Sequence, residues 1–195
     1  MDQYCAACGS PTEECLVEGR SRPVCTACGQ VVYQDPKLAV AVLIARQGRV
    51  LLGKRGPGAR EAGKWSFPAG FVERGERVER AAVREAREET GLDVVVGDLI
   101  GLYSSDGETV VLAVYEATSV GEPRAGDDLT EVAWFATSEL PELAFPRDQR
   151  ILEEWLSTGS EVGSRTSEGD SSDSRPPTPS RYGVRALGDR ARPRG

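Results

Sequence analysis

The stretch that decides the fold, residues 70–92, reads GFVERGERVERAAVREAREETGL. Its second part, residues 77–90, is rich in Glu, Arg and Ala and contains neither proline nor glycine. Such a composition favours a helix. Gly91 follows directly, and a glycine after the last helical residue is typical of a helix C-terminus. The stretch therefore predicts a loop that leads into one well-bounded helix.

Three carboxylates of this helix share one face, because Glu85, Glu88 and Glu89 stand at i, i+3 and i+4. Like charges at this spacing repel each other, and bound cations would remove the repulsion. Mg²⁺ takes oxygen ligands and completes its shell with water and phosphate oxygens. The face is therefore a candidate platform for metal-assisted hydrolysis of a phosphate compound. The alternative is a solvated helix face with ordinary ion pairs, such as Arg84 with Glu88.

The spacing of the stretch resembles the Nudix box, Gly-x5-Glu-x7-Arg-Glu-U-x-Glu-Glu-x-Gly-U, where U is a bulky aliphatic residue. The matching positions are Gly70, Glu76, Arg84, Glu85, Glu88, Glu89, Gly91 and Leu92. Ala86 departs from the pattern, since it stands at the first U position and is small. The resemblance implies an enzyme, a Mg²⁺-dependent (or Mn²⁺-dependent) pyrophosphatase, that hydrolyses a nucleoside diphosphate linked to another group and releases two monophosphates.

The resemblance also implies a role for each box residue. The metal ligands would be Glu85, Glu88, Glu89 and the carbonyl group of Gly70. Glu76 would support the helix and the metal cluster, and Arg84 would orient a box glutamate. The group that activates water is left open between Glu85, Glu88 and an acid from a later loop. The candidates in that loop are Asp127, Asp128 and Glu131, for which the alternative is a solvated turn.

Other candidates for substrate contacts lie outside the box. Three cations precede it and are candidates for the distal phosphate: Lys54, Arg55 and Arg60. Three aromatic residues are candidates for stacking on a base: Phe71, Tyr103 and Phe145. For both sets a simpler alternative stays open. Loop cations are usually only solvated, and aromatic side chains usually belong to a core.

The composition of the chain excludes several catalytic mechanisms. The chain has 195 residues, a net charge of −7 and no histidine, so Ser-His-Asp triads, Cys-His pairs and imidazole metal ligands are excluded. The acidic balance disfavours broad binding to nucleic acid. No apolar run is long enough to span a membrane, and no basic segment followed by an apolar one opens the chain. We therefore expect a cytoplasmic protein without a membrane segment.

All five cysteines lie in the first 28 residues. Cys5-Ala-Ala-Cys8-Gly9 and Cys25-Thr-Ala-Cys28-Gly29 are two CxxCG units, and each can place two thiolates around one tetrahedral metal ion. We expect a structural Zn²⁺ held by Cys5, Cys8, Cys25 and Cys28. Cys15 falls outside the pattern. The alternative is a pair of redox disulfides, which the cytosolic setting disfavours.

The rest of the chain divides by composition. Residues 1–32 form the expected zinc ribbon, residues 33–157 the catalytic domain, and residues 158–195, rich in Ser, Gly, Asp, Arg and Pro, an expected disordered tail. Apolar periodicity predicts a second helix at 147–156 and strands at 38–45, 49–55, 94–103, 109–117 and 132–135. The expected fold is an α/β (α+β) mixed-sheet Nudix sandwich with a small N-terminal zinc ribbon.

A ribbon that leads into a Nudix domain resembles the group of NADH pyrophosphatases and of ADP-ribose or FAD pyrophosphatases. The Ser-Gln-Pro-Trp-Pro-Phe-Pro-x-Ser motif of the NADH enzymes is absent, so ADP-ribose, FAD or a related dinucleotide is the expected small-molecule substrate. Alternatives are a non-catalytic nucleotide or ADP-ribose sensor and a pyrophosphohydrolase of RNA ends or oxidised nucleotides. A homodimer is possible because many members of the group are dimers.

Overall fold

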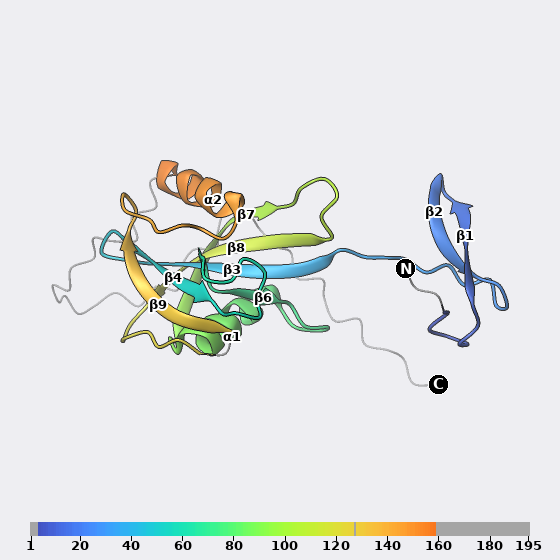
Figure 1. Cartoon of the computed structure of the whole chain (residues 1–195), viewed down its shortest axis with the longest axis horizontal. Helices are drawn as coiled ribbons and strands as arrows, with labels where there is room; N and C mark the ends of the chain where they lie inside the picture. Colours follow the sequence, from blue (N-terminus) through green and yellow to red (C-terminus); the bar gives the residue numbers. More distant parts are fainter. Residues whose placement is uncertain (1–3, 127, 159–195) are drawn as a thin grey trace, which may run out of the picture.

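The computed structural model describes residues 4–126 and 128–158. Asp127 and residues 159–195, which include almost all of the predicted tail, lie outside the described residues. The described chain forms an N-terminal ribbon followed by a larger domain that contains both helices (Figure 1). No described helix is long and apolar enough to cross a membrane.

The ribbon is built from two short strands, β1 (Thr12–Val17) and β2 (Arg20–Cys25), which pair antiparallel. The turn between them uses Glu18 and Gly19, both with positive φ angles of 51° and 77°. A CxxCG unit lies before β1 and another lies at the end of β2. The hairpin therefore brings the two units to the same end of the ribbon.

The larger domain confirms the predicted strands and helices, with ends that shift by a few residues. The strands are β3 (Lys37–Arg46), β4 (Arg49–Arg55), β5 (Trp65–Ser66), β6 (Ala69–Phe71), β7 (Val94–Tyr103), β8 (Val110–Ser119) and β9 (Leu129–Ala136). The helices are α1 (Val78–Thr90) and α2 (Pro146–Ser157). The mixed sheet with two helices is the predicted fold class.

The strands β3 and β4 form a short hairpin. Its turn has positive φ angles at Gln47 and Gly48, and only two residue pairs join the strands, Ala45 with Val50 and Arg46 with Arg49. Beyond this corner the strands take different partners. β3 pairs in parallel with β8 and antiparallel with β6, whereas β4 pairs antiparallel with β9 and β5. The hairpin therefore links two groups of strands.

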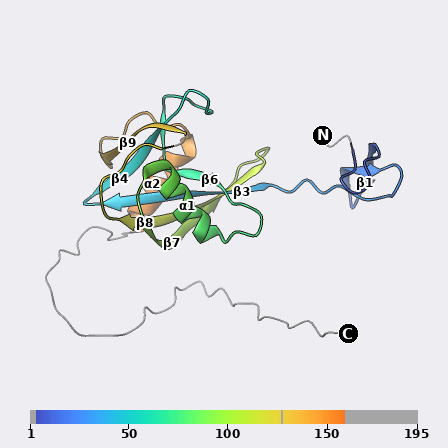
Figure 2. The ribbon, with the colours of Figure 1, turned by 90° about the horizontal axis from the view of Figure 1, so that it is seen from below.

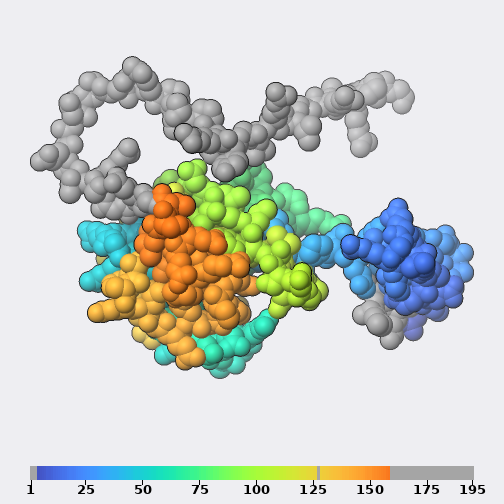
Figure 3. All heavy atoms as spheres, turned by 90° about the horizontal axis from the view of Figure 1, so that it is seen from above, coloured from blue at the N-terminus to red at the C-terminus, as the bar shows by residue number. Residues whose placement is uncertain are grey.

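The strand β3 is buried on both faces, which explains its continuous apolar sequence. One face, which includes Leu43, belongs to the cluster that contains Ile151 and Trp155 of α2. The other face, which includes Val42, belongs to the cluster with the alanines of α1. Figure 1 shows α2 above and α1 below the strands, and Figure 2 shows α1 lying over β3 from below. Figure 3 shows α2 covering the upper face.

The helix α1 ends where the sequence predicts. Gly91 adopts the left-handed conformation with φ 69°, and its N–H donates to the carbonyl group of Arg87. Ala81, Ala82 and Ala86 are fully buried against the sheet, so small side chains let the helix approach the strands closely. Ala86, the departure from the family pattern, therefore packs in the core. The helix presents its glutamates beside β6.

Candidate active site

Arg84 joins three of the box glutamates. Its Nε donates to Glu76 Oε1 at 3.0 Å and its Nη2 to Glu76 Oε2 at 2.9 Å. Its Nη1 donates to Glu85 Oε1 at 2.7 Å and to Glu88 Oε2 at 3.0 Å. The fork on Glu76 lowers the pKa of that carboxyl group to about 2, so it stays ionised. Arg84 therefore fixes the orientation of the carboxylates at the start of this face.

Glu89 lies in a different environment. Its side chain is buried, and Oε2 accepts a hydrogen bond from the backbone N–H of Ala69 at 3.0 Å. Burial raises the pKa of Glu89 to about 7, and the neighbouring charges of Glu85 and Asp128 act in the same direction. No ion pair joins Glu89 to any lysine or arginine within the described ranges. It is therefore a buried carboxylate without an ion-pair partner among these residues, and the charge of Arg55 across the pocket only partly opposes the rise of its pKa.

Gly70 makes room for Glu85. A Cβ atom at position 70 would lie 2.0 Å from Glu85 Cδ and 2.1 Å from Oε1, so any other residue would force the Glu85 carboxylate to move away from this position. The Glu85 side chain, 13% exposed, consequently lies against the backbone of β6. Burial raises its pKa, although Arg84 opposes this effect.

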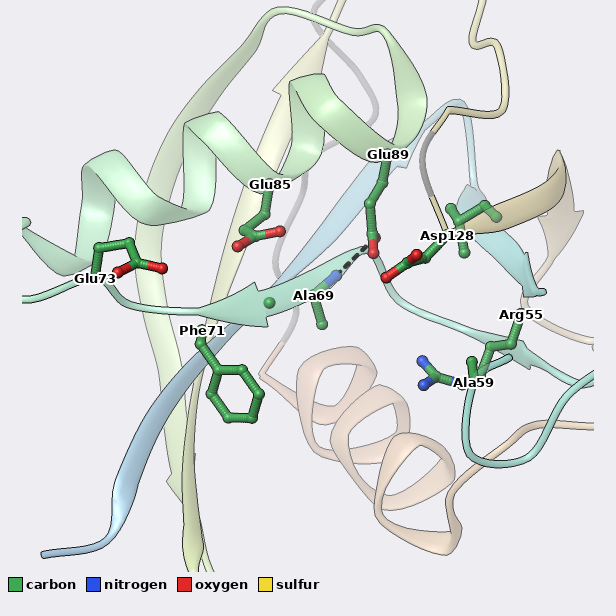
Figure 4. A pocket seen from close by; sticks show the side chains of 10 residues that line it. Arg55, Ala59, Ala69, Phe71, Glu73, Glu85, Glu89 and Asp128 are labelled. Atoms are coloured by element: carbon green, nitrogen blue, oxygen red, sulfur yellow. Dashed lines mark hydrogen bonds between the residues drawn. The ribbon is translucent and has the colours of Figure 1, made fainter. Parts of the chain in front are cut away.

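A pocket of about 370 Å³ opens between α1, β6 and the loops before β5 and β9. The residues that line it are Arg55, Ala59, Ala69, Gly70, Phe71, Glu73, Glu85, Glu89, Asp128 and Leu129. Figure 4 shows Glu85 and Glu89 reaching in from the helix and Asp128 pointing toward the end of Glu89. Acidic groups from three parts of the chain therefore converge on one cavity.

Not every residue proposed from the sequence lies at this pocket. Glu88 is 45% exposed and is held by Arg84, and it is absent from the pocket lining. Glu131 pairs with Lys54 at 3.7 Å instead. Four lining residues were not singled out from the sequence, and of these Glu73 is the one with a charged side chain, the others being Ala59, Ala69 and Leu129. The position of Glu73 three residues after Gly70, in the loop before α1, was the available signal.

The loop that carries Asp128 is fixed on both sides. The N–H of Arg124 donates to the carbonyl group of Thr90 at 2.8 Å, and the N–H of Gly126 donates to the backbone carbonyl group of Glu89 at 3.0 Å. On the other side, the N–H of Gly56 donates to the carbonyl group of Asp128 at 2.8 Å. The loop is therefore tied both to the end of α1 and to the end of β4, which positions Asp128 at the pocket.

The three candidate aromatic residues differ in position. Tyr103 is buried and its hydroxyl group donates to Glu154 Oε2 at 2.7 Å, so it belongs to the contact with α2. Phe71 is 49% exposed and lines the pocket. Phe145 lies beside the pocket residue Arg55, with 5.2 Å between the guanidinium carbon and the ring centroid. Phe71 is therefore the aromatic group directly available to a ligand in this pocket.

The four predicted cysteine ligands meet at the end of the ribbon, with all Sγ atoms within 4.8 Å of one another. The separations include 3.5 Å for Cys8–Cys25 and 3.8 Å for Cys5–Cys28. A tetrahedral zinc ion with bonds of about 2.3 Å separates its sulfur ligands by about 3.8 Å. The backbone N–H groups of Cys28 and Ala27 point at Cys25 Sγ and lower its pKa to about 6.

The four thiol groups can therefore hold one metal ion. None of the five described cysteines forms a disulfide, and Cys15 lies outside the cluster, next to Glu13. Gly9 and Gly29 have φ angles of 73° and 72°, which the tight turn after each second cysteine requires.

Family models match nearly all of the described chain. Residues 35–156 match the NUDIX domain, and residues 3–34 match the Nudix N-terminal domain, a zinc ribbon. A Nudix hydrolase structure from Nitrosomonas europaea superposes with a TM-score of 0.75 at 28% identity and covers 83% of this chain and 94% of that one.

Curated relatives agree with these matches. An ADP-ribose pyrophosphatase of Methanocaldococcus jannaschii is 39% identical over 130 residues, which cover 64% of this chain and 76% of that protein. The NAD-capped RNA hydrolase NudC of Stutzerimonas stutzeri is 32% identical over 76% of this chain, which spans about half of NudC (52%). The resemblances drawn from the sequence are thereby confirmed, and the chain belongs to the Nudix family of hydrolases.

Proposed function

We propose that this Nudix hydrolase uses Mg²⁺ to cleave the pyrophosphate bond of ADP-ribose or a related dinucleotide into two monophosphates. The observation that carries the proposal is the pocket in which Glu85, Glu89 and Asp128 converge beside the backbone of Gly70. The 39% identity to an ADP-ribose pyrophosphatase supports ADP-ribose as the first substrate to test.

The pocket residues fit a hard divalent cation. Glu85, Glu89 and the Gly70 carbonyl group offer oxygen ligands, which Mg²⁺ and Mn²⁺ prefer. Glu89 is buried without an ion pair among the described residues, and its neighbours Glu85 and Asp128 are acids. Removing the charge of one of these groups would relieve the repulsion, and so would a bound cation. Glu88, also predicted as a ligand, would need to turn from Arg84 to reach the pocket.

A divalent cation, when bound, supplies neutralisation of the phosphate oxygens and lowers the pKa of water. The chain's own residues do the rest. Water attacks one phosphorus atom, the bond from that phosphorus to the bridging oxygen breaks, and the bridge leaves with the other monophosphate. The proton lost by water passes to a carboxylate of the pocket. Arg84 holds Glu85 in place throughout by its 2.7 Å hydrogen bond.

We infer that the proton acceptor is Glu85 or Asp128, the two sequence candidates for this role that line the pocket. Both line the pocket, whereas Glu88 and Glu131 do not. Asp128 comes from the loop before β9, and its carboxylate points toward the end of Glu89 (Figure 4). Comparing Glu85→Gln, Glu88→Gln and Asp128→Asn for the pH dependence of kcat would separate the base from the metal ligands. Loss of the acidic limb in one variant identifies the base.

For the ribbon we propose a structural Zn²⁺ on Cys5, Cys8, Cys25 and Cys28. The sulfur separations match a tetrahedral site, and soft thiolate ligands select zinc over magnesium. The ion would hold the two turns together, since few other side chains of the ribbon are buried.

A second substrate class is supported by one observation. The chain is similar to proteins named NAD-capped RNA hydrolase over 76% of its length, and that span includes more than the Nudix domain alone. In such a substrate the bond broken would again be a pyrophosphate, with RNA joined to one side. The net charge of −7 argues for the small molecule first.

The deciding experiment is a panel of ADP-ribose, FAD, NADH, NAD⁺, NAD-capped RNA and an oxidised dGTP with Mg²⁺, and products separated by chromatography. We expect ADP-ribose to give AMP and ribose 5-phosphate with the highest kcat/KM. A higher value for capped RNA would move the function to RNA ends. Tight binding of ADP-ribose without turnover of any compound would make the protein a sensor and overturn the proposal.

A further inference from the structure

Three arginines surround the ring of one phenylalanine beside the pocket. The guanidinium carbons of Arg147, Arg55 and Arg60 lie 4.7, 5.2 and 5.9 Å from the centroid of Phe145. They come from two distant parts of the chain, since Arg55 ends β4 and Arg60 lies in the loop after it, whereas Arg147 lies in the first turn of α2. The fold therefore gathers three positive charges around one aromatic ring.

These charges are only partly compensated by the protein, through the nearby carboxyl groups of Asp148 and Glu61. Among the described residues, neither Arg55 nor Arg60 forms an ion pair, and Arg147 Nε lies 3.9 Å from Asp148 Oδ1. Arg147 Nε is buried and has no hydrogen-bond partner. The nearby acid Glu61 is engaged by Lys64 at 3.0 Å. Three guanidinium groups that share one ring repel one another, and an anion between them would remove this repulsion.

The cluster adjoins the carboxylate pocket. Arg55 lines the pocket together with Ala59, while its Nε is fixed by the Arg60 carbonyl group at 2.6 Å. Figure 4 shows Arg55 on the side of the pocket that faces away from α1, with its guanidinium group turned toward the pocket space. A substrate whose first phosphate lies at Glu85 and Glu89 would therefore extend toward Arg55.

We propose that Arg55, Arg60 and Arg147, held around Phe145, form an anion subsite that binds the substrate phosphate farther from the carboxylates. The inference rests on the proposed function for the identity of the substrate. Guanidinium groups suit this task because their planar donors match two phosphate oxygens at once. Contact with the ring holds each guanidinium group in place before the anion binds, which lowers the ordering cost.

Binding of inorganic phosphate tests the subsite without any turnover. In the zinc-containing full chain, the arginine Hε–Nε signals are recorded by NMR while phosphate is added in Mg²⁺-free buffer. We expect the signals of Arg55, Arg60 and Arg147 to shift together. Arg60→Gln and Arg147→Gln should each raise the phosphate Kd about tenfold, the effect of one lost charge-assisted hydrogen bond.

Arg150→Gln is the matched control, since Arg150 is on the same helix and pairs with Glu154 at 3.6 Å. Its removal should leave the phosphate Kd unchanged. Equal weakening by Arg150→Gln and Arg147→Gln, or no shift of the three signals, would overturn the subsite. Melting temperatures of all three variants within a few degrees of the parent exclude unfolding as the cause.

Kinetics then assign the subsite to the reaction. With the best substrate of the panel, Arg60→Gln and Arg147→Gln should raise KM about tenfold and leave kcat within about twofold, because they remove binding shared by substrate and transition state. An unchanged KM would overturn the assignment. If no compound is hydrolysed, the proposed function fails, whereas the phosphate titration still decides whether the anion subsite exists.

Discussion

In the ribbon, residues 4–32, the buried side chains are those of Cys5, Pro23 and Cys25. In the catalytic domain, two clusters of apolar side chains lie on the two faces of β3 and include both helices. Large apolar side chains of the ribbon, such as Leu16, are exposed. The first region can therefore be held by a metal ion, whereas the second is held by hydrophobic burial.

The same contrast applies to the use of metal in the two regions. The four thiol groups, two of them buried, are the groups through which the two CxxCG units of the ribbon meet, so their metal would be structural. The carboxylates of the catalytic domain sit at the rim of a core that is already complete, so their metal would serve chemistry. Removing a metal ligand should therefore unfold the ribbon, whereas in the catalytic domain it should abolish activity and leave the fold intact.

The largest expected effect is the loss of the ribbon's fold when zinc is removed. Structural zinc contributes on the order of 10 kcal/mol in small domains. All three tryptophans lie in the catalytic domain, so their fluorescence reports that region alone. After chelation and return of Mg²⁺, we expect the NMR signals of Gly9 and Gly29 to collapse to random-coil positions, with tryptophan fluorescence unchanged.

Cys25→Ser should reproduce this result, and Cys15→Ser should not, because Cys15 lies outside the cluster. Dispersed NMR signals of the ribbon in the absence of metal would contradict the claim that a metal ion holds this region.

Glu85→Gln should remove function and keep the fold. We expect kcat to fall by about 10³-fold, as for the loss of a principal charge-stabilising group in other active sites. The melting temperature should change by no more than a few degrees, because Arg84 keeps its hydrogen bonds to Glu76 and Glu88. Steady-state hydrolysis with Mg²⁺ measures the effect, and the exposed Glu139→Gln is the control. Full activity in Glu85→Gln would refute the ligand assignment.

Truncation of an apolar side chain should lower the free energy of unfolding in the catalytic domain but not in the ribbon. Leu43→Ala, at a fully buried position, should lower the free energy of unfolding by about 3 kcal/mol. Leu16→Ala, at a position 80% exposed, should change it by less than about 0.5 kcal/mol. Urea titrations followed by NMR signals from both regions measure the two values. Similar losses for the two variants would mean that the ribbon has a core of its own.

The smallest expected effect concerns Asp148, whose buried carboxyl group has a pKa raised to about 7 by burial, against the opposing charges of Arg147 and Arg55. In the unfolded chain the group titrates near pH 4. Between these values the folded state holds more protons, so stability falls as pH rises from about 4 to 7. Asp148→Asn should therefore be more stable than the parent at pH 8, by about 1–2 kcal/mol.

At pH 4 the two proteins should differ little, since the carboxyl group is then protonated in the folded state. Thermal melts across this range give the comparison, with the exposed ribbon residue Glu13→Gln as control. A constant difference at all pH values would show that Asp148 does not titrate as its burial requires.

The regular elements of the catalytic domain were predictable because their signals are local. The continuous apolar run predicts β3, and Gly91 predicts the end of α1, each from a few neighbouring residues. The strands β5 and β6 were not predicted, since they have two and three residues and exist through pairing with β4 and β3. No local periodicity exists in so short a segment. The boundaries at 32 and 157 stay predictions.

In the site, the box spacing predicted which glutamates share a face but not which of them enter the pocket. Around the helix axis, Glu89, four positions after Glu85, is rotated by about 40° to one side of it. Glu88, three positions after Glu85, is rotated by about 60° to the other side. The sheet lies on the first side, so Glu89 is buried and Glu88 faces Arg84. The cluster around Phe145 was missed because long-range folding, not spacing, brings Arg147 to Arg55.

The parallel pairing of β3 with β8 has a consequence for biosynthesis. Lys37 pairs with Val110, and Ile44 with Ala117, so one edge of the central strand has no partner until β8 has left the ribosome. Because α1 packs on β3, β7 and β8, its glutamates also wait for that event. The ribbon needs only local contacts and can fold much earlier. A nascent chain would therefore capture zinc long before it has a pocket for magnesium.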